Sequence, residues 1–230
     1  MAVLAVGGSL GWAAREPLGL QALLADSSTG TGEQLQVQGS DGSTIQLNTA
    51  SAIDLRYSSA QRQLSLLRGE LTLDSNGADN RPFIVSTRVG QLSTQNGQLL
   101  LRENDAGLLL AVRRGSVTVD SQSNPLRQVQ AGQVVQLSMS GAASAVQLHG
   151  DPWAWTDGVL SVQQMPLGEF ISELSRYRPG LLRCADEVAR LRVSGTYQLA
   201  DTEQILLLLA RTLPVRIDYR TRYWVSIGAA

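Results

Sequence analysis

The sequence predicts an all-β domain followed by a small α+β domain. Between residues 34 and 148, short runs of alternating apolar and polar residues are separated by Gly, Asn, Asp and Ser, a pattern typical of short strands and turns. After residue 150, strands alternate with two apolar stripes at helical spacing. We therefore expect a membrane-proximal stub and linker over residues 1–30, the β domain over 31–148 and the α+β domain over 151–230. Residues 138–150, which are rich in Ser, Ala and Gly, are predicted to connect the two domains.

The first predicted hairpin shows how the β domain begins. Residues 34–38 and 44–48 alternate strictly between apolar and polar side chains, as half-buried strands do. Asp41-Gly42 lies between them, and this pair favours a tight hairpin turn because both positions accept positive φ. Further strands are predicted at residues 64–67, 71–73, 83–85, 108–112, 117–119 and 134–137. Such a series is typical of a β sandwich or a short β-solenoid.

A short internal repeat leaves these two architectures open. Residues 68–75 (RGELTLDS) align with residues 114–121 (RGSVTVDS), with five of the eight positions identical. Repeated units favour the stacked coils of a solenoid. Two similar hairpins of one sandwich would give the same repeat.

The composition argues against several classes of function. The 230 residues include 19 basic residues, all of them Arg, against 20 acidic residues, so the chain lacks the basic surplus of a nucleic-acid-binding protein. A single Cys (Cys184) and a single His (His149) exclude an internal disulfide and a metal centre rich in Cys or His. Nucleophile elbows, phosphate-binding loops and calcium-binding loops are absent from the sequence. We therefore expect no enzymatic activity, no cofactor and no metal site.

Four acidic residues of the β domain could still supply a catalytic pair. Glycoside hydrolysis needs two carboxyl groups that flank the scissile bond, and the candidates are Glu33, Asp41, Glu70 and Asp74. Charged residues in strands and turns are mostly exposed to solvent. The simpler interpretation is therefore that these four residues are solvated turn and edge residues.

Two β-α-β units in tandem make up the predicted α+β domain. Its strands are predicted at residues 160–162, 181–182, 191–193, 215–219 and 223–227. The first helix begins at Pro166 and ends before Pro179. Its apolar stripe consists of Leu167, Phe170, Ile171, Leu174 and Tyr177. The second helix covers about residues 201–212, with Asp201 or Thr202 as its N-cap. We expect both helices to lie on one face of a sheet.

The end of the chain offers candidate partner-binding residues. Leu207 and Leu208 lie outside the main apolar stripe of the second helix, so they either pack against the β domain or face a partner. Arg, Tyr and Trp, which dominate binding hot spots, gather at residues 216–224, where an edge strand could also accept a partner's strand. The alternative is an ordinary solvated face with Trp224 in the core. The candidate partner-binding residues are Leu207, Leu208, Arg211, Arg216, Arg220, Tyr223 and Trp224.

Residues 1–14 are free of charged side chains but too short to cross a membrane, which takes about 20 apolar residues. One interpretation is a weakly ordered terminus. The other is the outer end of a spanning helix that begins outside this chain. Trp12 fits the second interpretation, because Trp collects at membrane interfaces, and Pro17 would then end the helix.

Several motifs far apart in the chain form one specific pattern. They are Asp41-Gly42-Ser43 through Leu47-Asn48 and Ser51, Arg62 through Gly69-Glu70, Arg81-Pro82-Phe83-Ile84-Val85, Ala131-Gly132-Gln133, and the block from Trp155 to Arg176-Tyr177. This pattern resembles the FecR-type regulators of iron-transport sigma factors, which are membrane-anchored anti-sigma proteins. Around residues 95–99 the chain departs from the family, which usually has a strand with Thr and Phe there. The α+β domain is also similar to the short N-terminal domain of secretins and TonB-dependent transducers.

The resemblance implies a regulator rather than an enzyme. Such a protein would hold a sigma factor through a cytoplasmic domain that this chain lacks, cross the inner membrane once and place this chain in the periplasm. The partner there would be the N-terminal signalling domain of an outer-membrane TonB-dependent siderophore transducer, and proteolysis of the regulator would release the sigma factor. In the related short domains the positions of Leu207 and Leu208 are commonly polar, which favours an interface at these two residues.

Two other functions stay open. A β-rich carbohydrate-binding or carbohydrate-cleaving module would need a concave cleft with aromatic residues and paired carboxylates, but residues 34–148 contain only Tyr57 and Phe83 as aromatic residues. A secretin-like assembly component would need only the α+β domain and would associate into rings.

Overall fold

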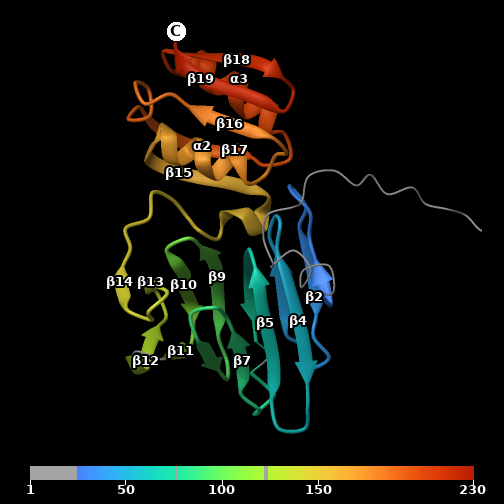
Figure 1. Cartoon of the computed structure of the whole chain (residues 1–230). Coiled ribbons are helices and arrows are strands. Elements are labelled where there is room, and N and C mark those ends of the chain that lie inside the picture. Colours follow the sequence, from blue (N-terminus) through green and yellow to red (C-terminus); the bar gives the residue numbers. More distant parts are fainter. Residues whose placement is uncertain (1–24, 76, 122–123) are drawn as a thin grey trace, which may run out of the picture.

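Two seven-stranded β-sheets face each other in the N-terminal part of the chain (Figure 1). The computed structural model describes residues 25–75, 77–121 and 124–230, without the side chains of residues 124–126. Residues 1–24 of the expected stub, with Trp12 and Pro17, therefore lie outside the described residues. Within the described part of the chain, no helix is both long and apolar enough to cross a membrane.

We call these two sheets the outer sheet and the inner sheet. The outer sheet contains, in spatial order, β1 (Ser27–Ser28), β4 (Ala52–Tyr57), β5 (Arg62–Arg68), β7 (Phe83–Ser86), β8 (Gln91–Thr94), β11 (Ser116–Ser121) and β12 (Asn124–Gln130). The inner sheet contains β14 (Ala143–Ala145), β13 (Val134–Leu137), β10 (Gly107–Arg114), β9 (Gln98–Asn104), β6 (Glu70–Asp74), β3 (Thr44–Leu47) and β2 (Leu35–Gln38). Strands β5 and β7 run parallel, whereas the hairpin neighbours such as β2 and β3 run antiparallel.

One hydrophobic core fills the space between the two sheets. Ile45 and Leu47 of β3 point into it from the inner sheet, and Leu64 and Leu66 of β5 point into it from the outer sheet. The polar residues between them face the other way, as the alternation of the sequence predicts. Two sheets that share one core form a sandwich, and the predicted all-β region is confirmed.

The internal repeat marks two corners at which the chain changes sheet. Residues 68–75 lead from β5 of the outer sheet to β6 of the inner sheet, and residues 114–121 lead from β10 of the inner sheet to β11 of the outer sheet. Each corner contains a glycine with positive φ, +89° at Gly69 and +75° at Gly115. The similarity of the two segments therefore reflects a shared corner geometry, which glycine accepts without steric cost.

The central strands of the inner sheet, β6, β9 and β10, are buried on both faces, which explains their unbroken apolar runs. In β9, Leu99 and Leu101 face the sandwich core, whereas Leu100 points to the other side. That second face is covered by residues of the C-terminal part of the chain, namely Trp153, Trp155, Tyr177 and Leu199. The stretch at residues 95–99, where the chain departs from the family pattern, contains the start of β9 at Gln98.

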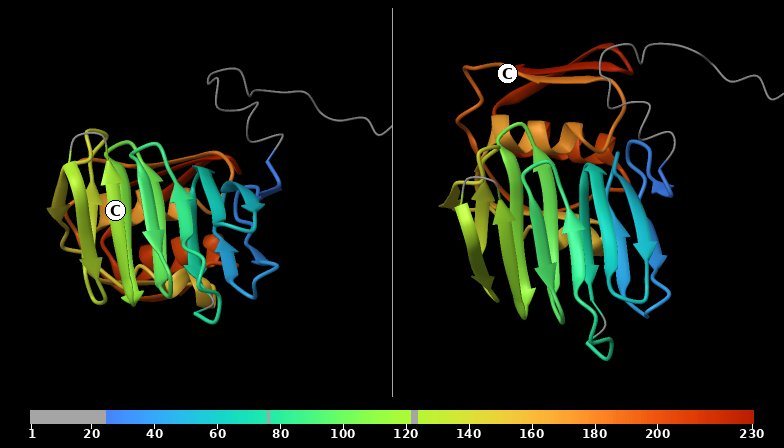
Figure 2. Two further views of the ribbon diagram at one scale, coloured as in Figure 1. Left: turned by 90° about the horizontal axis from the view of Figure 1, so that it is seen from below. Right: turned by 60° about the horizontal axis from the view of Figure 1, so that its bottom comes forward.

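The C-terminal part consists of two small sheets with two helices between them (Figure 2). Its elements are η1 (Ala154–Asp157), β15 (Val159–Pro166), α2 (Leu167–Ser175), β16 (Leu181–Cys184), β17 (Arg192–Gln198), α3 (Thr202–Thr212), β18 (Val215–Thr221) and β19 (Trp224–Ala229). Strands β15 and β17 pair with each other, while β16, β19 and β18 form a three-stranded sheet.

The helices of the C-terminal part share one core with both small sheets. Phe170 of α2 and Leu206 of α3 are completely buried in it, together with Val193 of β17 and Ile227 of β19. The elements follow the predicted β-α-β order, but the prediction that both helices lie on one face of a single sheet is wrong. The alternation in β15 and β17 predicts that one face of each strand is buried, but it does not predict which strands pair. The sequence therefore could not show whether the strands form one sheet or two.

The stretch predicted to connect the two parts contains a further strand. Residues 143–145 form β14, which pairs antiparallel with β13 at the edge of the inner sheet. Its residues are small and mostly exposed. They therefore lack the alternating apolar pattern that predicts a strand.

Candidate partner-binding surface

The predicted partner-binding residues are all exposed, and they lie on two different sides of the C-terminal part. Leu207 and Leu208 of α3 are 47% and 43% exposed, so they do not pack against the β region. Arg211 follows them on the same helix and is also exposed. Because α3 lies on the inner side of the three-stranded sheet, these residues are separated from the outer face of that sheet. The predicted set is therefore divided between a helix flank and a sheet face.

The outer face of the three-stranded sheet combines arginines with an aromatic residue. Val215, Ile217 and Tyr219 of β18 point toward the helices, so the residues between them point outward. We call the outward residues of this sheet the arginine–aromatic face; they are Leu181, Arg183, Arg216, Asp218, Arg220 and Trp224.

Stacking holds the side chains of this face in place. The Arg220 guanidinium lies 4.7 Å from the ring centroid of Trp224, and Leu181 is the direct neighbour of Trp224 across the β16–β19 pair. At the adjoining turn, the Arg222 guanidinium lies 4.5 Å from the Tyr223 ring. A guanidinium stacked on an aromatic ring keeps its N–H groups free to bind a carboxylate. The face therefore suits a partner with acidic residues.

Strand β18 is also an open edge. Within the three-stranded sheet it pairs with β19 and ends the strand order, so one side of its seven residues presents unpaired backbone groups. Such an edge can accept a strand from another protein.

Polar contacts behind the face fix the β18–β19 turn. Arg178, which is 7% exposed, pairs with Glu203 of α3 at 2.7 Å and donates a hydrogen bond to the Arg222 carbonyl at 3.1 Å. The second carboxylate oxygen of Glu203 accepts a hydrogen bond from the Tyr219 hydroxyl at 2.8 Å. Partial burial and the Glu203 carboxylate raise the pKa of Tyr219 to about 12, so this hydroxyl stays a donor at neutral pH.

A second polar cluster joins the two parts of the chain. The Glu70 carboxylate of β6, which is almost completely buried, accepts hydrogen bonds from Asn48 at 2.8 Å and from Arg176 at 2.6 Å. Asn48 also donates to the Tyr177 hydroxyl at 2.8 Å. These four residues belong to three motifs that lie far apart in the sequence. We identified the three motifs in the sequence but did not predict that their polar residues bond to one another. The presence of a polar residue in each motif is the signal that could have suggested this contact.

Glu173 extends this junction to strand β9. It pairs with Arg176 at 2.5 Å and with Arg102 at 2.8 Å. Burial opposes ionisation of Glu173, but the charges of Arg176 and Arg102 outweigh burial and hold the pKa of Glu173 below its usual value. The junction is thus a network of ionised side chains beside the apolar contact of Trp153, Trp155 and Tyr177.

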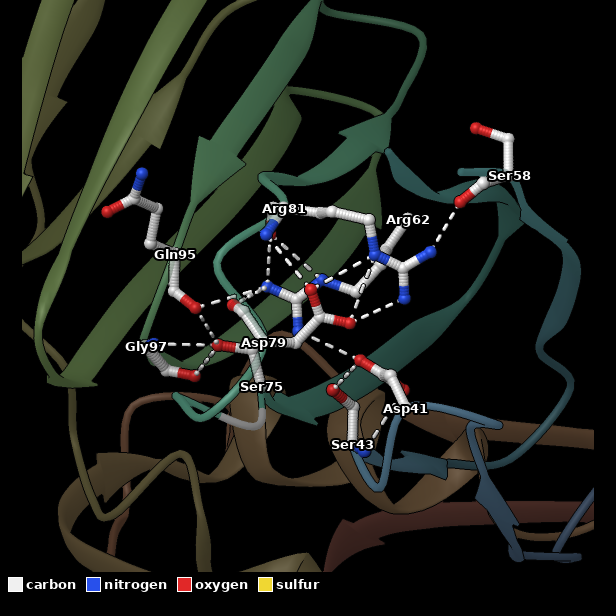
Figure 3. A network of polar contacts seen from close by, with 9 residues as sticks. All are labelled: Asp41, Ser43, Ser58, Arg62, Ser75, Asp79, Arg81, Gln95 and Gly97. Atoms are coloured by element: carbon white, nitrogen blue, oxygen red, sulfur yellow. Dashed lines mark hydrogen bonds and ion pairs between the residues drawn. The ribbon is translucent and has the colours of Figure 1, made fainter. Parts of the chain in front are cut away.

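Asp41, Arg62 and Arg81, which belong to the other motifs, form a separate network of polar contacts within the sandwich (Figure 3). Arg62 and Asp41 form an ion pair at 2.8 Å, with both side chains completely buried. Arg62 also donates to the carbonyls of Arg81 at 2.6 Å and Gln95 at 3.2 Å. Burial would raise the pKa of Asp41, but hydrogen bonds from Ser43 and Arg62 outweigh it and lower the pKa. This network ties three turns together and leaves no opening for a substrate at the pair.

The four carboxylates proposed as a catalytic pair are not brought together. Asp41 and Glu70 belong to the two networks above, Asp74 pairs with Arg114 at 2.6 Å, and Glu33 accepts the Gly30 N–H at 2.8 Å. A groove of about 650 Å³ on the sandwich is lined by Ser, Thr, Asn, Gln, Gly and Pro residues, without aromatic or acidic side chains. The described residues contain no group of three or more His, Cys, Asp or Glu that could hold a metal ion.

Comparison with known proteins matches most of the sandwich to a family model. Residues 25–118 match the family model described as FecR protein. Two crystal structures of a "putative anti-sigma factor" from Parabacteroides distasonis ATCC 8503, at 1.65 and 2.50 Å resolution, have the same fold, with TM-scores of 0.71 and 0.70 and sequence identities of 19% and 20%. Each match covers 89% of this chain and 98% of the crystallised chain. None of the curated proteins compared matches the sequence. The matched segment contains the Asp41, Asn48, Arg62 and Glu70 motifs, so the resemblance to the FecR family is confirmed over this segment.

Proposed function

We propose that this chain is the periplasmic sensor part of an anti-sigma regulator. In this proposal its C-terminal part binds the N-terminal signalling domain of an outer-membrane TonB-dependent siderophore transducer. Contact with the sigma factor would be made by a cytoplasmic segment of the regulator. The transducer would report the arrival of a siderophore, and the regulator would then release the sigma factor.

The observation that carries the proposal is the arginine–aromatic face with its exposed Trp224. Trp224 is 40% exposed and Tyr223 is 47% exposed, although large aromatic side chains in a small domain are normally buried. Together with Leu207 and Leu208, they give the C-terminal part an unusual amount of exposed apolar surface. Exposed apolar patches that are rimmed by arginine are typical of protein-binding sites.

The match of residues 25–118 to the FecR family supports the regulatory part of the proposal. The crystal structures with the same fold carry the description "putative anti-sigma factor". The secretin-like alternative would use the same C-terminal part, but it would not need the FecR sandwich. Ring formation by the purified protein would favour that alternative.

Titration calorimetry between the full chain and the signalling domain of the cognate transducer tests the proposal. We expect the double variant Arg220→Ala, Trp224→Ala to bind roughly 30-fold more weakly, because truncation of a hot-spot residue costs about 2 kcal/mol or more. We expect a similar loss for Leu207→Asp with Leu208→Asp if the helix flank belongs to the same interface.

Leu35→Asp is the matched control for the leucine variants. Leu35 is 40% exposed on β2, outside the C-terminal part, and its substitution should leave binding unchanged. If the wild-type chain does not bind the signalling domain, the proposed partner is wrong. If the wild-type chain binds and both double variants bind equally well while keeping the wild-type circular dichroism spectrum, the proposed surface is wrong.

A further inference from the structure

The six residues that follow α2 contact both parts of the protein. This coupling segment, residues 176–181, begins at the C-cap of α2 and ends at the first residue of β16. Its first residues reach the inner sheet, and its last residues reach the β18–β19 turn beside the arginine–aromatic face.

The contacts toward the inner sheet are made by the beginning of the segment. Arg176 binds the buried Glu70 carboxylate at 2.6 Å, and its carbonyl accepts the Thr49 hydroxyl at 2.8 Å. The same Thr49 oxygen accepts the Gly32 N–H at 2.8 Å. Tyr177 is buried against the inner sheet and accepts a hydrogen bond from Asn48. The segment is therefore bonded through side chains and backbone to the loop that connects β3 and β4.

The contacts toward the partner-binding surface are made by the end of the segment. Arg178 donates to the Arg222 carbonyl at 3.1 Å and pairs with Glu203 at 2.7 Å. The Leu181 N–H donates to the Tyr223 carbonyl at 2.6 Å. At Gly180, where φ is +100°, a Cβ atom would lie 2.2 Å from the same Tyr223 carbonyl oxygen. The β18–β19 turn thus lies directly against the segment's backbone.

The shortness of the segment links the two sets of contacts. The backbone of Pro179 has a fixed φ, and Arg178 and Tyr177 are consecutive buried residues that point to opposite partners. If the β18–β19 turn shifts, it must therefore either carry Arg178 and Gly180 with it or break its hydrogen bonds to the segment. Tightly packed contacts of this kind transmit small displacements rather than absorb them.

We propose that the coupling segment transmits occupancy of the arginine–aromatic face to the loop between β3 and β4 on the inner sheet. The proposal deepens the proposed function and rests on it for the identity of the occupant. In this proposal, binding of a partner at the arginine–aromatic face changes the stability of the contacts that the coupling segment makes with the inner sheet.

Hydrogen exchange measured residue by residue by NMR on the full chain tests the coupling without any partner. In Arg178→Met we expect the amide of Gly32 to exchange about tenfold faster. The Gly32 N–H is bonded to the Thr49 hydroxyl, and that hydroxyl is held by the Arg176 carbonyl, two residues before Arg178 in the coupling segment. Arg190→Met is the matched control, because Arg190 is an exposed arginine in the turn between β16 and β17, outside both the arginine–aromatic face and the coupling segment, and its substitution should leave Gly32 unchanged. Glu203→Gln weakens the same Arg178 contact more mildly and serves if Arg178→Met does not fold.

Faster exchange near Tyr223 with no change at Gly32 in both variants would overturn the coupling. A second arm adds the transducer signalling domain to the wild-type chain, where binding should change the exchange at Gly32. Absence of binding in this arm contradicts the proposed function and leaves the result of the variants as the test of the coupling. Binding with no change at Gly32 contradicts the coupling alone.

Discussion

At the scale of single residues, the buried pair Arg62–Asp41 illustrates what a sequence motif can and cannot reveal. Asp41-Gly42 predicts a hairpin turn, and the structure has this turn between β2 and β3. The carboxylate of Asp41, however, also neutralises an arginine 21 residues away. Sequence reasoning could not find this role, because a charged residue in a turn is usually solvated. The guanidinium also lies 5.2 Å from the Phe83 ring centroid, so Arg62 packs as well as pairs.

Removal of Arg62 should be severely destabilising. In Arg62→Met the Asp41 carboxylate stays buried without its cation, and breaking a buried pair in this way costs about 3–5 kcal/mol. The free energy of unfolding measured in urea should fall by that amount. Arg56→Met, at an exposed position on β4, should change it by less than about 0.5 kcal/mol. A loss below about 1 kcal/mol in Arg62→Met would mean that Asp41 is satisfied by its other hydrogen bonds.

At the scale of elements, periodicity predicts which segments form strands and helices better than it predicts their neighbours. Four of the five predicted stripe residues of α2 are buried on the helix, but α2 ends at Ser175, so Tyr177 lies beyond it and packs against the inner sheet. The N-cap of α3 is Asp201, one of the two predicted candidates, and it accepts the Gln204 N–H at 2.9 Å. Strands β1, β4, β8, β9, β12 and β14 were not predicted. Strand β4, for example, contains the charged residues Asp54 and Arg56, and β14 contains only small residues. The pairing of β15 with β17 in a sheet of their own depends on tertiary contacts that no local pattern encodes.

The corners between the sheets should be intolerant of a side chain. Gly69→Ala meets two penalties, because φ is +89° and the new Cβ would lie 2.3 Å from Ser51 Oγ and 2.6 Å from its Cα. Gly132 has a similar φ of +83°, but a Cβ there would meet nothing within 4 Å. Gly132→Ala should therefore cost about 1 kcal/mol, and Gly69→Ala at least about twice as much. Thermal unfolding of both variants checks the order, and equal losses would show that the Ser51 side of the corner can relax.

At the scale of the whole molecule, the junction joins the two parts into one unit. The inner sheet contributes Glu70, Asn48 and the apolar residue Leu100, and the C-terminal part contributes Arg176 and two tryptophans. Sequence reasoning predicted two separate patterns and left their relative placement open. The candidate surface was proposed from residue types alone, yet its division into a helix flank and a sheet face required the positions of α3 and β18.

Acid should weaken this junction. The pKa of Glu173 is held below its usual value of 4.5, so the ionised carboxylate contributes stability that is complete above that value and is lost as the pH falls through the lowered pKa. Between about pH 6 and pH 3, the wild-type chain should therefore lose more of its free energy of unfolding than Glu173→Gln, by about 1.4 kcal/mol for each unit of lowering.

Glu169→Gln serves as the control for this pH profile, because Glu169 lies on the same helix with a side chain that is 58% exposed. Its urea-unfolding profile should follow that of the wild-type chain. A Glu173→Gln profile that also follows the wild-type chain would show that Glu173 does not report on the junction.

The double burial of the inner sheet bears on how such a protein can change during evolution. Leu100 of β9 and Ala111 of β10 belong to an apolar surface of the inner sheet that the C-terminal part covers, so the sandwich cannot be inherited as a free-standing module without new polar residues on β9 and β10. A recombination event that exchanged the C-terminal part would have to bring side chains equivalent to Trp153 and Trp155 to cover this surface. We therefore expect the sandwich and the C-terminal part to be inherited together. The arginine–aromatic face lies on the far side of the C-terminal part from the sandwich and is free to diverge with its partner.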